Sequence, residues 1–341
     1  YSGGVVRFIH NDKNQLPCDV VILDEMSMVD VKLFQALLTA LRYSCRVIMV
    51  GDADQLPSVG AGNILGETIR SGLIPTVCLD QIFRQAERSL IVENAHNIVD
   101  GKPLQKGTRT DDFFFLEADG EAAQRLVCDL VTTRLPRSYG FDPIKDIQVL
   151  CPTKLGMTGT QALNTELQNL LNPPAPGKPQ LQSAARVFRV GDKVMQVRNN
   201  YELVWHRIGG EQGVGAYNGD IGIVESINLR DRSMVVRMDD RRLVYPAENL
   251  SELEIAYAIT VHKSQGSEFP AVILPAAQVP PRLCYRNLLY TGVTRARKLC
   301  VLAGRRDTVN QMMSNIRQNL RYSGLAALLQ AELPPEQLRT E

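Results

Sequence analysis

The sequence lacks several patterns that assign a protein quickly to a class. It has no loop of the form G-x-x-x-x-G-K-[ST], which grips the phosphates of a nucleotide through its backbone. No apolar run approaches the roughly 20 residues that a membrane-spanning helix needs, and no targeting peptide is visible. These absences predict a soluble, cytoplasmic protein without a membrane partner. They also leave any nucleotide site without its phosphate loop.

A zinc site or a disulfide framework has little support. The chain holds seven cysteines, but none forms a C-x-x-C pair, and most lie beside Val, Ile or Leu in strand-like runs. This usage is typical of reduced core thiols rather than of a zinc site or a disulfide framework.

The formal net charge is only +1, from 38 Lys and Arg against 37 Asp and Glu. Any contact with a nucleic acid would therefore have to come from local grooves rather than from a strongly basic surface.

The chain does contain a regular alternation of apolar segments. Its 341 residues, 44% of them hydrophobic, are enough for two or three domains. Strand-length apolar runs alternate with amphipathic helix-length segments, which is typical of parallel sheets covered by helices. The runs at 18–24 and 46–52 predict buried strands. Further strands are expected at 76–80, 112–117, 146–152, 271–275 and 298–304, and helices at 31–42, 87–99, 122–133 and 282–293.

Two segments depart from this alternation. After a proline-rich break at 172–180, short β-runs with tight turns continue to about Leu250 and predict a small inserted barrel. Trp205, with His206 and Arg207 after it, is expected in a loop, where it either stacks on a base or anchors the barrel. Residues 4–17 predict a hairpin with a polar tip at 11–14.

An acidic pair follows the first of the predicted buried strands. In a site that hydrolyses nucleotides, the first carboxylate of such a pair holds Mg²⁺ through its waters, and the second accepts a proton from the attacking water. We therefore assign Asp24 to the Mg²⁺ shell and Glu25 to the general base. By itself, the dipeptide is more often a solvated turn that leads into a helix, here with Asp30 as its N-cap.

The segment 51–65 carries a second acidic strand end. Gln55 lies beside it, and its amide can both donate and accept, the capacity needed to sense a γ-phosphate and its attacking water. Gly60 and Gly62 are expected to leave backbone open at the start of a helix, which suits phosphate contacts. An ordinary turn between a strand and a helix is the competing interpretation.

Five segments together resemble the later motifs of superfamily 1 helicases. Their residues are similar to the motif sequences of the RecD-like, 5′-to-3′ branch. In chain order they are DEMSMVD, GDADQLPSVGAGNIL, LDQIFRQ, AYAITVHKSQGSEF and NLLYTGVTRARK, and the resemblance covers about residues 4–305. No long insertion separates GNIL from TVCLDQIFRQ. In this respect the chain resembles the stand-alone helicases of this branch rather than the subunits of a nuclease complex. The family's phosphate loop would lie upstream, so we interpret the chain as the later part of a motor.

The resemblance implies an α/β fold with two RecA-like P-loop NTPase motor domains, the first truncated, and an inserted small SH3-like β-barrel. It also implies a strand-separating pin at the hairpin. The expected divisions are 1–17 for the pin, 18–78 for the first motor domain, 79–184 and 251–341 for the second, and 185–250 for the barrel.

ATP and Mg²⁺ are the cofactors that the resemblance implies. Arg84 and Arg295 match the arginines that reach the γ-phosphate from the second motor domain, and they would stabilise transition-state charge when the cleft closes. Gly266 matches a glycine beside the phosphates. Glu268 matches an acidic residue that contacts the nucleotide sugar.

Single-stranded DNA and duplex DNA junctions are the expected partners, and the sequence points to no protein partner. A polar cluster at 260–264, where a strand gives way to a helix, suits contacts with DNA phosphates. Asn199 and Tyr201 would hold backbone and a stacked base at the barrel, unless they belong to an ordinary loop. The other DNA candidates are Thr260, His262, Lys263 and Ser264, then Pro57, Ser58 and Asn63, with Phe8, Ile9 and His10 in the pin.

The sequence thus predicts an ATP-dependent 5′-to-3′ DNA helicase whose hydrolysis drives movement along single-stranded DNA. Without a phosphate loop, this chain alone is expected to be a poor ATPase. Two other interpretations stay open, namely the helicase portion of a conjugative relaxase and a non-catalytic DNA-binding or regulatory module.

Overall fold

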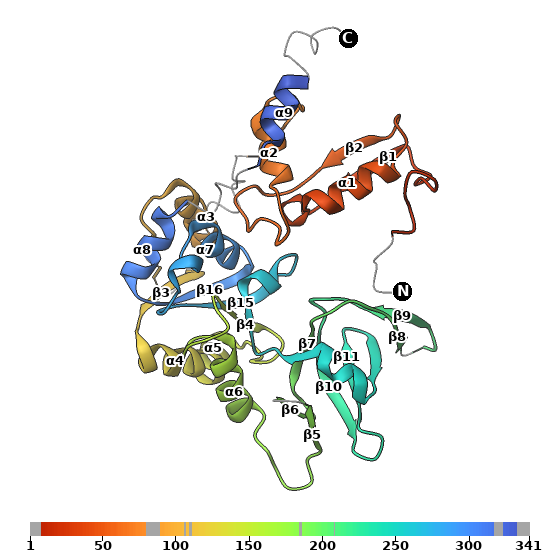
Figure 1. Ribbon diagram of the computed structural model, residues 1–341. Coiled ribbons are helices and arrows are strands. Elements are labelled where there is room, and N and C mark those ends of the chain that lie inside the picture. The colour runs from red at the N-terminus through yellow and green to blue at the C-terminus, as the bar shows by residue number, and fades with distance from the viewer. Residues whose placement is uncertain are drawn as a thin grey trace.

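The computed structural model describes residues 8–79, 89–105, 107–108, 111–183, 186–207, 209–316 and 323–332. Four sheets organise these residues, one of five strands, one of seven strands and two of two strands each (Figure 1). We call the elements around the two-stranded sheet at 20–23 and 46–49 the first lobe, those around the five-stranded sheet the second lobe, and the seven-stranded sheet the β domain. None of the described helices is long and apolar enough to cross a membrane.

The second lobe is built on a parallel sheet with the strand order β14-β4-β15-β16-β3. Successive side chains of a strand face opposite sides, so an uninterrupted apolar strand needs cover on both faces. Val272 and Leu274 lie in one core and Ala271 and Ile273 in the other, and all four are completely buried. The strands are β3 (Phe113–Glu117), β4 (Ile147–Cys151), β14 (Ala258–Thr260), β15 (Phe269–Ala276) and β16 (Ala296–Gly304).

Helices cover both faces of this sheet. One face carries α3 (Leu90–Asp100), α7 (Arg286–Val293) and α8 (Arg306–Ser314). The other carries α4 (Gly120–Asp129), a π-helical turn (Leu130–Arg134), α5 (Leu135–Tyr139) and α6 (Thr160–Leu171). The strands expected at 112–117, 146–152, 271–275 and 298–304 are confirmed within a few residues, as are the helices at 122–133 and 282–293 and the described part of the helix at 87–99.

The first lobe pairs β1 (Val20–Leu23) with the parallel β2 (Arg46–Met49), and it also contains α1 (Val31–Ala40) and α2 (Ile64–Ser71). Helix α1 begins where the sequence predicts, because the Asp30 carboxylate accepts a hydrogen bond from Leu33 N at 2.8 Å. The prediction that both strands are buried is wrong, since Ile22 is 67% exposed and Ile48 49%. Leu23 and Met49 pack with the helices, whereas Ile22 and Ile48, one position away, face the opposite side.

The β domain is antiparallel, with the strand order β13-β7-β10-β11-β12-β8-β9. The expectation of a loop around Trp205 is wrong, because Trp205, His206 and Arg207 lie in β8 and Trp205 pairs with Leu243 of β12. The chain turns only later, at Gly209 and Gly210, which both have positive φ. The strands are β7 (Lys193–Gln196), β8 (Asn200–Arg207), β9 (Gln212–Ala216), β10 (Ile221–Asn228), β11 (Ser233–Met238), β12 (Arg241–Tyr245) and β13 (Leu253–Ile255), preceded by the hairpin of β5 (Gln180–Ser183) and β6 (Arg186–Arg189).

A buried carboxylate fixes the β domain to the second lobe. Asp192, next to β7, accepts hydrogen bonds from the side chains of Gln168 (2.6 Å), Asn172 (2.6 Å) and Tyr257 (3.0 Å). The adjacent Lys193 is also buried, and its Nζ donates to the carbonyl oxygen of Ile147 in β4 at 3.2 Å. Each residue therefore ties the start of β7 to elements of the second lobe.

Helix α9 (Leu325–Glu332) packs against α2 of the first lobe, although it follows the second lobe in the chain (Figure 1). Ala326 N donates to Glu67 Oε2 at 3.0 Å, and Gln330 Nε2 donates to Ser71 O at 3.1 Å. The chain thus contacts the first lobe again after completing the sheet of the second.

The strand expected at 76–80 is wrong over its described residues, 76–79. These residues form no strand, and Val77 is 87% exposed. A strand needs a neighbour to receive its backbone hydrogen bonds, and none of the described strands pairs with this segment. Asp80 lies outside the described residues.

Candidate functional site

The acidic strand ends lie next to each other at one edge of the first lobe. Leu23 of β1 is paired with Met49 of β2, so the residues after both strands leave the sheet side by side. Val50 N donates to Leu23 O at 2.7 Å, and Met26 N donates to Val50 O at 3.0 Å. Ligands of parallel α/β sheets bind at this carboxyl edge.

The predicted acidic pair occupies a constrained turn. The Asp24 carboxylate accepts a hydrogen bond from Glu25 N at 2.8 Å. Glu25 has a φ of 52°, a left-handed conformation that is uncommon for residues other than glycine. Such strain persists where the surroundings hold it, and it is common at functional sites. The next residue, Met26, is buried and anchors the turn in the core of the first lobe.

The loop after β2 docks on the second lobe. Leu56 is completely buried within the core of the second lobe. Its N–H donates to Thr291 Oγ1 of α7 at 2.8 Å, and its carbonyl oxygen accepts from Gln265 Nε2 at 2.8 Å. Asn287 Nδ2, also on α7, donates to Asp54 O at 2.7 Å. The main chain beside Gln55 is therefore held from both ends by the second lobe.

Asp52 is the centre of the polar contacts at this docking point. Its Oδ1 accepts from Asp54 N at 2.9 Å, while Oδ2 accepts from Tyr290 OH at 2.8 Å and from Gln55 Nε2 at 3.3 Å. Burial, reinforced by the negative charge of Asp52, raises the pKa of Tyr290, so its hydroxyl stays protonated and donates. Burial and the same charge raise the pKa of Asp54.

Two buried polar atoms at this point make no hydrogen bond with the described residues. One is Gln55 Oε1 and the other is Asn287 Oδ1. A buried acceptor without a partner is costly, so it is normally satisfied by a water or a ligand. Together with the acidic turn, these acceptors fit a hydrated Mg²⁺–nucleotide group and its attacking water.

Arg295 follows α7 and is 5% exposed. Its Nη1 donates to Ser267 O at 3.3 Å, while its buried Nε makes no hydrogen bond with the described residues. A buried guanidinium with an unused donor suits an anionic ligand. Arg84, the other predicted arginine, lies outside the described residues.

The two residues expected near the nucleotide, Gly266 and Glu268, lie in the turn before β15. Gly266 has a φ of 74° and is exposed, so its backbone is accessible. The Glu268 carboxylate instead pairs with Arg297, with 2.6 Å between Nε and Oε2. Since both side chains of this pair are about half exposed, the pair is a weak one that a ligand can displace.

The polar cluster at 260–264 divides into accessible and buried members. Thr260 ends β14, and a 3-10 turn follows at Val261–Ser264. Lys263 is partly exposed and pairs with Glu254 Oε2 at 2.7 Å, while the His262 ring lies 3.5 Å from Tyr285 OH. Burial lowers the pKa of His262, which therefore stays neutral near pH 7.

Ser264 does not match the expected DNA contact, because it is completely buried and its hydroxyl donates to Val261 O at 2.7 Å.

The predicted DNA residues of the first lobe shape the loop before α2. Ser58 is buried and donates to Gly60 O at 3.2 Å, and Asn63 caps α2 by accepting from Gly66 N at 3.2 Å. Pro57, which directly follows the docked Leu56, is partly exposed. The expectation of open backbone at Gly60 and Gly62 is wrong, because Gly60 packs against the Asp30 side chain and Gly62 against that of Val31.

The β domain presents two aromatic rings beside Asn199. Tyr201 is 51% exposed and Tyr217 45%, and their rings meet edge to face with 6.0 Å between centroids. Asn199 Nδ2 donates to Tyr201 OH at 3.1 Å, and Asn199 Oδ1 accepts from Asn218 N at 2.8 Å. Exposed aromatic faces held in place by an amide suit the stacking of unpaired bases.

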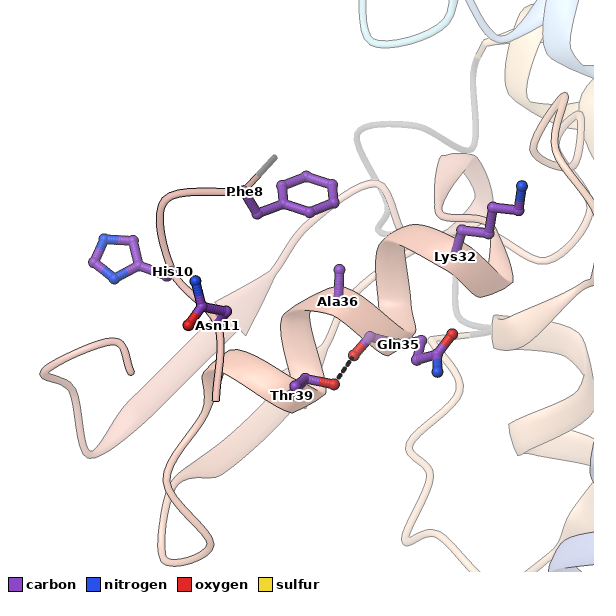
Figure 2. A pocket seen from close by; sticks show the side chains of 7 residues that line it. All are labelled: Phe8, His10, Asn11, Lys32, Gln35, Ala36 and Thr39. Atoms are coloured by element: carbon purple, nitrogen blue, oxygen red, sulfur yellow. Dashed lines mark hydrogen bonds between the residues drawn. The ribbon is translucent and has the colours of Figure 1, made fainter. Parts of the chain in front are cut away.

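The described part of the expected pin begins at Phe8. The polar tip of the pin is confirmed as a turn, closed by hydrogen bonds between Asn11 and Asn14 at 3.0 and 3.2 Å. Among the residues described from Phe8 onward, the pairing of the two arms does not extend beyond this single bridge. A pocket of about 370 Å³ separates this segment from α1 (Figure 2). Phe8 lies above the helix, while the His10 ring points away from it. The pocket is lined by Phe8, His10, Asn11, Lys32, Gln35, Ala36 and Thr39.

The residues through which the second lobe holds the first were not predicted from the sequence. Gln265, Asn287, Tyr290 and Thr291 all lie inside the segments that carried the family resemblance, but neither composition nor spacing gave them a role. The contact between Tyr290 and Asp52 joins residues 238 positions apart. The available signal was the concentration of polar residues on a short, otherwise apolar helix.

The architecture and the docked strand ends define a class, the RecA-like motors with an inserted β domain. Residues 4–117 match the AAA domain family, residues 163–238 the ATP-dependent RecD-like DNA helicase SH3 domain, and residues 255–303 the UvrD-like helicase C-terminal domain. Over these segments the chain is similar to the RecD-like helicases. The expected fold class is thereby confirmed.

Relatives with curated names agree with this assignment. The chain is 34% identical over 303 residues to the ATP-dependent RecD2 DNA helicase of Deinococcus radiodurans, covering 88% of this chain and 38% of that protein. It is 30% identical over 342 residues to the RecBCD enzyme subunit RecD of Mycobacterium tuberculosis, covering 95% of this chain and 56% of that protein. The chain therefore spans less than two thirds of either relative.

Solved structures share the fold at lower identity. The Pif1 helicase from Bacteroides superposes with a TM-score of 0.52 at 19% identity, covering 93% of this chain and 76% of that chain. The Pif1 helicase from Candida albicans gives a TM-score of 0.51 at 16% identity, with 92% and 77% covered. At these identities the likeness concerns the fold alone.

Proposed function

We propose that the protein containing this chain is an ATP-dependent DNA helicase that moves 5′ to 3′ along single-stranded DNA. The observation that carries the proposal is the docking of the loop after β2 on α7, which brings an acidic strand end of one lobe against polar side chains of the other. The name of the similar ATP-dependent RecD2 DNA helicase supports this activity. Since the chain spans only part of their length, the activity belongs to the whole protein.

The proposed roles divide the hydrolysis between the lobes. ATP, bound with Mg²⁺, would supply the phosphoryl group whose transfer to water releases the free energy for movement. Asp24 would hold the metal through its waters, Glu25 would accept the proton of the attacking water, and Gln55 would orient that water. Arg295 would neutralise charge on the phosphates from the second lobe, Arg84 would add to this effect, and Gly266 and Glu268 would lie along the nucleotide.

The same proposal gives single-stranded DNA a path over both lobes and the β domain, with the pin meeting the duplex junction. Thr260, His262 and Lys263 face the DNA backbone from the second lobe, and Pro57 and Asn63 do so from the first. Tyr201 and Asn199 stack and hold a base at the β domain. Because Ser58 and Ser264 are buried, we assign them to support of these loops rather than to contact.

The direct test measures ATP hydrolysis with and without single-stranded DNA, for this chain and for the complete gene product. We expect DNA-stimulated hydrolysis by the complete product and little by the chain, which has no phosphate loop. Glu25→Gln removes the proton acceptor but keeps the shape, and it should lower kcat by about 100-fold or more while DNA binding persists. A complete product that is inactive with DNA would mean a DNA-binding or regulatory derivative of this fold.

A further inference from the structure

The Asp52 carboxylate receives donors from both lobes. Gln55 Nε2 (3.3 Å) and Asp54 N (2.9 Å) belong to its own loop, whereas Tyr290 OH (2.8 Å) comes from α7. Tyr290 OH and Gln55 Nε2 reach the same oxygen, Oδ2. The tyrosine hydroxyl and the glutamine amide are therefore linked through a single atom across the lobe boundary.

This arrangement decides which way the Gln55 amide faces. An ionised carboxylate only accepts hydrogen bonds, so Gln55 must turn its NH₂ group toward Asp52. Its carbonyl oxygen, Oε1, then points away from the carboxylate. That oxygen is buried and makes no hydrogen bond with the described residues, so it is available as an acceptor.

We propose that Tyr290 is a positioning residue for ATP hydrolysis, whose hydroxyl holds Asp52 in the orientation that keeps Gln55 Oε1 free to accept a hydrogen bond from the attacking water. The inference rests on the proposed function. It makes the alignment of the water depend on contact between the lobes, because Tyr290 and Gln55 lie on opposite sides of the boundary.

The other contacts across the boundary act on different atoms. Thr291, Asn287 and Gln265 bond the main chain of residues 54–56 and fix the path of the loop. Tyr290 instead contacts the side chain that bonds the Gln55 amide. Loss of its hydroxyl should thus disturb the amide while the loop stays docked.

The decisive experiment measures steady-state, DNA-stimulated ATP hydrolysis by the complete gene product carrying Tyr290→Phe. We expect kcat to fall about tenfold, with the KM for ATP and the affinity for single-stranded DNA changed less than about twofold. Tyr139→Phe is the matched control, because Tyr139 lies on α5, is 44% exposed and stacks on Phe141. This control should behave as the wild type.

The same substitution in a Gln55→Ala variant distinguishes a positioning role of Tyr290 from simple support of the fold. If Tyr290 acts through the amide, Tyr290→Phe should cause no further fall in kcat when Gln55 is already alanine. An equal fall in the Gln55→Ala background, or a rise in KM that matches the fall in kcat, would overturn the inference. Wild-type kcat in Tyr290→Phe would overturn it as well.

Thermal unfolding tests the contact itself, without reference to activity. In the complete product, Tyr290→Phe and Asp52→Asn should each lower the midpoint, and the double variant should lower it by clearly less than their sum. Additive shifts would show that the two side chains are not coupled, and the inference would fail. If the wild type is inactive but the shifts are non-additive, the proposed function fails while the contact stands.

Discussion

The sheets of the two lobes contain similar apolar strands but bury them very differently. In the second lobe, Val149, Ile273 and Leu274 are completely buried, since helices cover both faces of the sheet. In the first lobe, Val20 and Ile22 are 48% and 67% exposed, because α1 and α2 pack on the opposite side. The comparison shows that an apolar run specifies a strand, whereas its neighbours decide how much that strand contributes to stability.

The largest expected effect tests this difference directly. Leu274→Ala removes a fully buried side chain and should lower the free energy of unfolding by about 3 kcal/mol, from lost burial and from the cavity left behind. Ile22→Ala removes a side chain that is already 67% exposed and should cost less than about 1 kcal/mol. Urea unfolding of the two variants measures both values. Equal losses would mean that the outer face of the first lobe is covered in solution.

An effect that is intermediate in size per pH unit comes from the buried lysine at the joint with the β domain. Burial lowers the pKa of Lys193 to about 7, whereas the unfolded chain keeps the ordinary value near 10.5. Between these values the unfolded state binds the extra proton, so stability should rise with pH from about 7 to about 10, by up to about 1.4 kcal/mol per pH unit. Unfolding followed across this range should show the rise.

Two variants test whether Lys193 causes this dependence of stability on pH. Lys193→Met removes the titrating group while keeping an unbranched side chain, and it should flatten this part of the pH dependence. Lys32→Met, on the exposed face of α1, should leave the slope of the wild type. If all three proteins share one slope, the lysine is charged in the folded protein.

The smallest expected effect concerns the packing of α9 on the first lobe. Glu67→Ala removes the carboxylate that accepts from Ala326 N, and it should cost about 1 kcal/mol locally while speeding amide hydrogen exchange in α9. Glu121→Ala is the control, since among the residues that the structure describes Glu121 pairs only with Arg125, on an exposed helix surface. Unchanged exchange in α9 would show that its contact with α2 does not depend on this cap.

The sequence predicted β3, β4, β15 and β16 of the second lobe well because each contains an apolar run of strand length. The strand expected at 76–80, over its described residues, and the loop expected at Trp205 were predicted wrongly because apolar and polar content alone does not say where a strand finds its partner. The acidic turn was found from local pattern. The contact between Tyr290 and Asp52 was not predicted, because it joins distant segments and arises only from the packing of α7 against the first lobe.

The buried contacts of Asp192 and Lys193 have a mechanical consequence. Since the β domain is bonded to the second lobe through side chains that water does not reach, the two should turn as one body. A small rotation at the lobe boundary then becomes a larger sweep at the rim that carries Tyr201 and Tyr217. If the protein has the proposed helicase activity, the β domain would serve as a lever arm, and the length of each advance along single-stranded DNA would depend on its reach as well as on the hinge.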